Sequence, residues 1–67
     1  MKPFAERLKE LRAEKSISTV ALGKAIGVSG PTISRWENSQ MEITSGYVVA
    51  LAKYFGVSTD YLLGLED

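Results

Sequence analysis

The guanidinium group of Arg35 is the part of this 67-residue chain best suited to recognising another molecule. On a helix through residues 29–37, Arg35 shares one face with Pro31, because four residues make about one helical turn. The opposite face carries the residues expected to pack inward, which are Ile33, Trp36 and Glu37. Guanidinium donors match the two acceptors of guanine in the major groove of DNA, and a proline ring suits the methyl group of thymine. The outward face therefore favours contact with base edges.

Small residues beside Arg35 extend this candidate base-contacting set. Its further members are Ser29, Gly30, Thr32 and Ser34. The hydroxyl groups of Ser29 and Thr32 can reach either a base or a phosphate. Gly30 has no side chain, so its expected contribution is a close approach of the backbone to DNA. For Arg35, contact with a phosphate and simple solvation on the surface both stay open as alternatives.

The composition argues against enzymatic chemistry. The chain has no cysteine and no histidine, which excludes disulfides, the usual zinc ligands and the usual nucleophile–base pairs. No glycine-rich phosphate loop or dinucleotide fingerprint is present. The sequence therefore predicts a protein that is not an enzyme and that needs no metal or other cofactor.

The charges are balanced overall but unevenly distributed. The chain has eight basic and eight acidic residues. Residues 1–40 carry an excess of Lys and Arg, whereas residues 41–67 carry an excess of Asp and Glu. Small domains can show such an imbalance by chance, but it is also typical of a protein with one face turned to DNA and an acidic back.

The chain is expected to be one soluble, cytoplasmic domain spanning residues 1–67. No apolar run approaches the roughly 18 residues needed to cross a bilayer. Residues 1–6 do not resemble a signal peptide, because acidic residues and not an apolar core follow them. Whether the chain is complete or is the N-terminal part of a longer protein stays open.

Five short helices are predicted to position the candidate residues. Phe4, Leu8 and Leu11 recur on one face and predict an amphipathic helix that ends near Lys15. Four further helices follow from typical N-cap residues, which are Ser18, Ser29, Thr44 or Ser45, and Ser58. The second, fourth and fifth helices are expected to end at Gly27, Gly56 and Gly64. No strand alternation is evident, so the predicted fold is all-α.

The order of these motifs resembles the phage-repressor and Cro-type helix-turn-helix (XRE) family. The matching segments cover residues 4–64 and are Arg-Leu-Lys-Glu-Leu-Arg (7–12), Leu22-Gly23, Ile26-Gly27-Val28-Ser29, Thr32-Ile33-Ser34-Arg35-Trp36-Glu37, Leu51-Ala52, Phe55-Gly56-Val57-Ser58 and Asp60-Tyr61-Leu62-Leu63-Gly64. The resemblance implies a lambda-repressor-like DNA-binding domain of five helices. Its helix-turn-helix comprises the second and third helices, and the third lies in the major groove.

The resemblance also implies where the DNA backbone is contacted. In the family the start of the second helix approaches a phosphate, and Thr19 stands where the family usually has glutamine. Free N–H groups at helix starts attract phosphate, and the polar loop after the third helix is another candidate. The phosphate candidates are Ser18, Thr19, Val20, Asn38, Ser39, Gln40, Ser45 and Gly46. This loop carries Glu42 and neither Lys nor Arg, so we expect weaker non-specific affinity than that of a basic repressor.

Three matched positions are expected to be structural. Arg12 and Glu37 align with a family ion pair that joins the first helix to the end of the third. Gly23 stands where the family usually has alanine, and a small residue there lets the second and third helices approach closely. Trp36 is expected in the core.

These features predict a transcriptional regulator of a prokaryote or phage that binds specific sequences of double-stranded DNA, most simply a repressor. A domain of this size contacts few bases, so we expect a homodimer on a two-fold operator with half-sites about one helical turn apart. Val57, Tyr61 and Leu65 are candidates for the dimer contact, with core packing as the alternative. The competing interpretation is a protein-interaction module, such as an antitoxin whose partner is a toxin.

Overall fold

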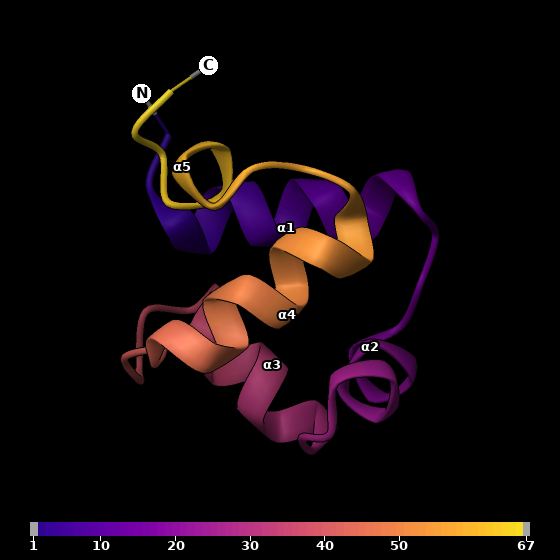
Figure 1. Ribbon diagram of the computed structural model, residues 1–67. Coiled ribbons are helices and arrows are strands. Elements are labelled where there is room, and N and C mark those ends of the chain that lie inside the picture. The colour runs from indigo at the N-terminus through magenta and orange to yellow at the C-terminus, as the bar shows by residue number, and fades with distance from the viewer. Residues whose placement is uncertain (1, 67) are drawn as a thin grey trace.

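The computed structural model describes residues 2–66, which form five helices and no strand. The helices are α1 (Phe4–Glu14), α2 (Thr19–Ile26), α3 (Gly30–Glu37), α4 (Ser45–Phe55) and α5 (Thr59–Leu62). In the view of Figure 1, α1 lies above α4 and α3 lies below it; α3 packs against α1 and α2, α4 packs against α2 and α5, and α5 also lies against α1. The prediction of an all-α fold with five short helices is confirmed.

Serine side chains begin three of the helices. The hydroxyl oxygens of Ser18, Ser29 and Ser58 accept hydrogen bonds from the backbone N–H groups of Ala21, Thr32 and Tyr61, at 3.0, 3.3 and 2.9 Å. Each such cap is worth about 1 kcal/mol. At α4, Thr44 occupies the N-cap position, but its side chain accepts no capping hydrogen bond. The predicted caps of α2, α3 and α5 are confirmed.

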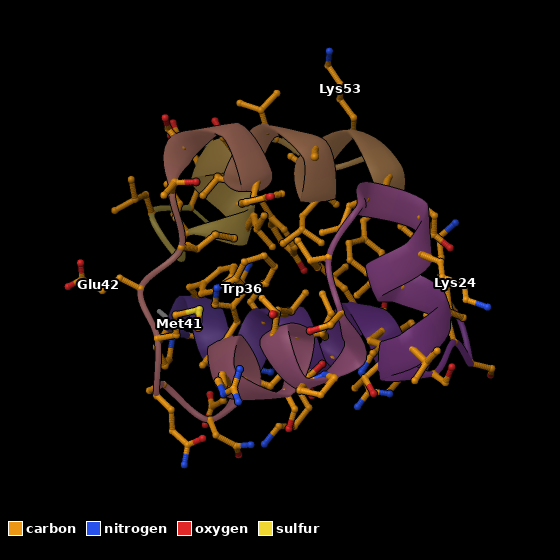
Figure 2. All side chains as sticks on the ribbon, turned by 90° about the horizontal axis from the view of Figure 1, so that it is seen from below. Lys24, Trp36, Met41, Glu42 and Lys53 are labelled. Atoms are coloured by element: carbon orange, nitrogen blue, oxygen red, sulfur yellow. The ribbon has the colours of Figure 1, made fainter. Side chains whose placement is uncertain are left out.

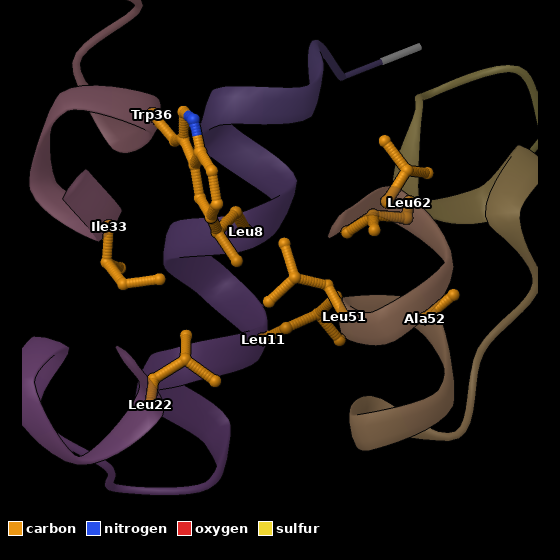
Figure 3. Packing of buried hydrophobic residues seen from close by; sticks show 9 residues of the cluster. Leu8, Leu11, Leu22, Ile33, Trp36, Leu51, Ala52 and Leu62 are labelled. Carbon is orange, nitrogen blue, oxygen red and sulfur yellow. The ribbon is translucent and has the colours of Figure 1, made fainter. Parts of the chain in front are cut away.

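The core draws buried apolar side chains from every helix. Its members are Leu8, Leu11, Leu22, Ile33, Trp36, Val48, Leu51, Ala52 and Leu62. Figure 3 shows Leu51 beside Leu8 and Leu11, where α4 packs against α1. Trp36 is 2% exposed, so its ring belongs to the core and is not a stacking platform for bases. Burial of Ile33 and Trp36 attaches one face of α3 to the rest of the molecule and leaves its other face outside.

The last turn of the fold is held against α1. The guanidinium carbon of Arg7 lies 4.0 Å from the centre of the Tyr61 ring, and Arg7 Nη1 donates a hydrogen bond to the Glu66 carbonyl oxygen at 3.3 Å. Gly64 is buried with φ +80°, and a Cβ at this position would collide with the carbonyl oxygen of Lys2. The start and the end of the described chain are therefore packed directly on each other.

We expect Gly64→Ala to lower the free energy of unfolding by about 2–3 kcal/mol, because it adds a steric collision to an unfavourable backbone conformation. The matched control is Gly56→Ala, which has a similar φ of +70° but open space where the methyl group would lie. The control should lose only about 1 kcal/mol. Thermal and urea unfolding measure both, and equal losses would contradict the packing of Gly64 on Lys2.

Candidate nucleic-acid interface

The turn between α2 and α3 sets the angle between these helices. Gly27 ends α2 in the left-handed conformation, with φ +86°, as predicted. The carbonyl oxygen of Gly23 accepts hydrogen bonds from the N–H groups of Gly27 and Val28, both at 2.8 Å. A Cβ on Gly23 would collide with the carbonyl oxygen of Val28 and lie 3.1 Å from the carbonyl carbon of Ser29. The absence of a side chain at Gly23 thus lets α2 lie close to the backbone that leads into α3.

The two faces of α3 differ in their exposure to solvent. Pro31 and Arg35 are exposed, whereas Ile33, Trp36 and Glu37 on the other face are buried. Among the ion pairs of residues 2–66, none involves Arg35. The guanidinium donors of Arg35 are therefore presented outward from a helix whose inner face is fixed.

The hydroxyl groups on the flanks of α3 already have partners within the helix. Ser29 Oγ and Thr32 Oγ1 lie 3.0 Å apart, and Ser29 Oγ also caps the helix. Asn38 Nδ2 donates to the Ser34 carbonyl oxygen at 2.9 Å and lies 3.4 Å from Ser34 Oγ. Thr32 and Ser34 are half-buried. Any base contact by these residues competes with a local hydrogen bond, and Arg35 has no such competition.

The structure gives Gly30 a packing role. This residue is buried at the start of α3, and Val20 of α2 packs against it. A Cβ at Gly30 would lie 2.9 Å from Val20 Cγ2 and 3.3 Å from the Cα and N atoms of Val20. Glycine here allows the N-termini of two helices to pack together, and a close approach of its backbone to DNA stays a prediction.

The phosphate candidates lie at three places around α3. Ser18, Thr19 and Val20 stand at the start of α2, Asn38, Ser39 and Gln40 follow α3, and Ser45 and Gly46 begin α4. All of them are exposed except Thr19, which is half-buried. Ser39 adopts a left-handed conformation with φ +56°, a region of backbone conformation that glycine adopts more readily than serine.

Charged side chains are sparse around this surface. Figure 2 looks onto α2, α3 and the loop of residues 38–44, with Lys24 and Glu42 pointing outward at opposite edges. Glu42 is exposed on the loop after α3. The loop therefore offers backbone and neutral polar groups to a phosphate but no cation.

An ion pair fixes the C-terminal end of α3. Arg12 Nε donates to Glu37 Oε2 at 2.6 Å, and Arg12 Nη2 donates to Glu37 Oε1 at 3.1 Å. Arg12 Nη1 also donates to the Ile17 carbonyl oxygen at 3.0 Å. The hydrogen bond to Glu37 raises the pKa of Arg12 above its already high ordinary value, so the guanidinium stays charged. One side chain thus joins α1, the α1–α2 connection and α3.

The three candidates for a dimer contact differ in exposure. Val57 packs partly against the core, and Tyr61 is half-buried beneath Arg7. Leu65 is 63% exposed. Leu63, which belongs to the same apolar C-terminal stretch of the sequence, is also exposed, and sequence reasoning missed one further exposed apolar residue, Val49. They line a groove between α4 and α5 together with Ile43, Ser45, Val48 and Thr59. The sequence signal that could have found Val49 is its position directly after Val48, which faces the core.

The described residues hold neither a metal-binding cluster nor a membrane-spanning helix. Across residues 2–66, the structure brings together no group of three or more side chains suited to holding a metal ion. None of the helices in this range is both long and apolar enough to cross a membrane.

A helix-turn-helix family model matches residues 8–62, which include all of α2 and α3. The chain belongs to this helix-turn-helix family. Its similarity to the repressor protein C2 of Salmonella phage P22 is 43% identity over 60 residues, covering 90% of this chain and 28% of that protein. The transcriptional regulator PrpR of Mycobacterium tuberculosis is 36% identical over 61 residues, covering 91% of this chain and 13% of that protein. The chain thus spans well under half the length of these curated relatives.

The fold resembles that of a solved repressor complex. The P22 c2 repressor bound to a synthetic operator superimposes with a TM-score of 0.90 and 38% sequence identity, covering 98% of this chain and 100% of that chain. A solution structure of the P22 c2 DNA-binding domain superimposes with a TM-score of 0.85 and 40% identity, over 92% of this chain and 82% of that one. The lambda-repressor-like fold predicted from the sequence is confirmed.

The Arg12–Glu37 contact predicts a strong coupling between α1 and α3. The Glu37 side chain is only 5% exposed, so Arg12→Met leaves a buried carboxylate without its partner. We expect a loss of about 3 kcal/mol in the free energy of unfolding. The double variant Arg12→Met/Glu37→Met should recover most of that loss.

The exposed ion pair between Lys2 and Glu10 provides a control on another part of α1. Lys2→Met should change the free energy of unfolding much less, because solvent screens this pair. Urea unfolding measures the unmodified protein, the single variants Arg12→Met, Glu37→Met and Lys2→Met, and the double variant. Losses at Arg12 and Glu37 that simply add in the double variant would show that the pair is not coupled.

Proposed function

We propose that this chain binds a specific sequence of double-stranded DNA through the outward face of α3 and acts as the DNA-binding domain of a transcriptional repressor. The observation that carries the proposal is the exposed guanidinium of Arg35, which has no ion-pair partner among residues 2–66, on a helix whose opposite face is buried. Arg35 contacts the O6 and N7 acceptors of a guanine in the major groove. The similarity to a repressor solved on a synthetic operator supports this reading.

The DNA backbone is contacted at the edges of α3. The start of α2 carries free backbone N–H groups and lies against the start of α3, because Val20 packs on Gly30. Asn38, Ser39 and Gln40 approach a phosphate on one side, and Ser18 and Thr19 approach one on the other. Ser45 and Gly46 add the start of α4. These neutral contacts set the register of α3 in the groove without adding much long-range attraction.

Two copies of the chain bind a two-fold operator. A single α3 presents few base-contacting side chains, so a second half-site is needed for useful specificity. Leu65, together with the exposed Val49 and Leu63 near the α4–α5 groove, supplies the apolar contact between the copies.

Arg35→Ala should weaken binding to the preferred duplex by about 1–3 kcal/mol and relax the base preference at one position. The preferred duplex comes from selection out of a random pool at moderate salt, and fluorescence anisotropy titrations measure the affinities. Uniform weakening across all duplexes would assign Arg35 to a phosphate.

The matched control for Arg35 is Lys53→Ala. This lysine is exposed on α4 and points away from α3 in Figure 2, so the substitution removes a positive charge at a distance from the proposed interface. It should leave the base preference unchanged. If the selection enriches no motif with the unmodified protein, the DNA-binding proposal fails and a protein partner, such as a toxin, becomes the better hypothesis.

The dimer proposal predicts cooperative binding of two chains to the full operator. Leu65→Glu should reduce that cooperativity, because it places a charge in an apolar contact, so that at partial saturation complexes with one chain on the whole operator accumulate in place of complexes with two. Sedimentation of the protein–DNA complex measures the stoichiometry. Ala13→Glu adds the same charge to an exposed position of α1 and should have no such effect. Unchanged cooperativity with Leu65→Glu would remove this residue from the dimer contact.

A further inference from the structure

An exposed valine on α2 lies beside the start of α3. Val20 is 55% exposed in the first turn of α2, on the same side of the molecule as Gly30. Val20 packs closely on Gly30, because a methyl group added at Gly30 would lie only 2.9 Å from Val20 Cγ2. Pro31, the next residue along α3, is also exposed. Each of the two helices thus has an exposed apolar residue in its first turn, and Val20 packs directly on the residue that precedes Pro31.

Close packing gives Val20 a defined position. Its backbone N and Cα atoms approach Gly30 as well, each 3.3 Å from the position of an added Cβ. A β-branched side chain on a helix also has few rotamers. Val20 therefore has a fixed position relative to α3, whereas a long lysine or arginine side chain can adopt many conformations.

The backbone of Val20 and its side chain suit different parts of a DNA duplex. The backbone N–H group at the helix start suits a phosphate, whereas the side chain has no polar atom for one. Among the base edges exposed in the major groove, the apolar group is the 5-methyl of thymine. A rigid, apolar patch beside the start of a helix in that groove therefore matches thymine and not the other bases.

We infer that the side chain of Val20 contacts the 5-methyl group of a thymine and so determines specificity from α2 as well as from α3. This inference rests on the proposed function, because it requires α3 to lie in the major groove. Cytosine lacks the methyl group at the same ring position, so the contact favours an A·T pair over a G·C pair at this site.

The test removes only the methyl group from the DNA. In the duplex selected by the unmodified protein, each thymine is replaced in turn by deoxyuridine, and affinity is measured by anisotropy titration. At one position the unmodified protein should lose about fourfold in affinity, the value expected for one buried methyl group. Val20→Ala should bring the thymine-to-uracil affinity ratio at that position close to one.

The ratio compares two duplexes with the same protein sample, so any change in stability or active fraction caused by Val20→Ala cancels. Lys53→Ala is the control, because Lys53 is also exposed but lies on α4, outside both the proposed DNA contacts and the proposed dimer contact. This control should keep the full fourfold ratio. A uracil penalty that persists unchanged in Val20→Ala, or a preferred duplex in which no thymine methyl matters, overturns the inference.

The same duplexes separate this inference from the proposed function. Arg35→Ala titrated against them should weaken binding whether or not Val20 contacts a methyl group. If Arg35→Ala weakens binding but Val20→Ala leaves the uracil penalty unchanged, only the inference fails. If the unmodified protein prefers no duplex, the proposed function fails and the inference fails with it.

Discussion

The constraint on which the structure depends is that α3 is too short to be a helix by itself. It has eight residues, and an isolated helix of fewer than about 12 is marginal in water. Its form and direction must therefore come from contacts with the rest of the chain. Ile33 and Trp36 hold its inner face in the core, Ser29 caps its start, and Glu37 holds its end through Arg12. Each fixed point lies on the inner face or at an end, which leaves the middle of the outer face, with Arg35, available.

The same constraint explains where the fold accepts unfavourable local choices. Glycine at positions 23 and 30 weakens the helices that contain it, by about 1 kcal/mol relative to alanine. In return, the carbonyl of Val28 fits against Gly23, and Val20 fits against Gly30. The partly buried Arg12–Glu37 pair is comparable, because desolvation offsets much of its attraction, yet its geometry admits one orientation of α3. Local stability is lower at these points, and the relative placement of α2 and α3 is better defined.

Much of this arrangement could be predicted from the sequence, because its signals are local. A serine before an apolar run predicts a cap, and a glycine after one predicts a left-handed end; Ser18 and Gly27 are confirmed on that basis. The inward face of α3 followed from its helical period. The burial of Gly30 could not be predicted, because a glycine at a helix start is compatible with close packing and with an exposed position, and only the position of Val20 decides between them. Likewise, the cover that Arg7 places over Tyr61 depends on how α1 and α5 meet, which no local pattern encodes.

The sparse charge around α3 bears on how a protein of this kind distinguishes its site from other DNA. Non-specific affinity comes mainly from cations that displace counterions from phosphates, and it falls steeply with salt. Here the loop after α3 presents neutral polar groups and Glu42, and the helix starts present backbone N–H groups. Such contacts require close, correctly oriented phosphates, so they act only after α3 has entered the groove in register. A surface built in this way gains less from random encounters with DNA and depends more on the match between its side chains and the base edges. Rigid apolar contacts suit such a surface, because they add discrimination between bases without adding attraction to every phosphate.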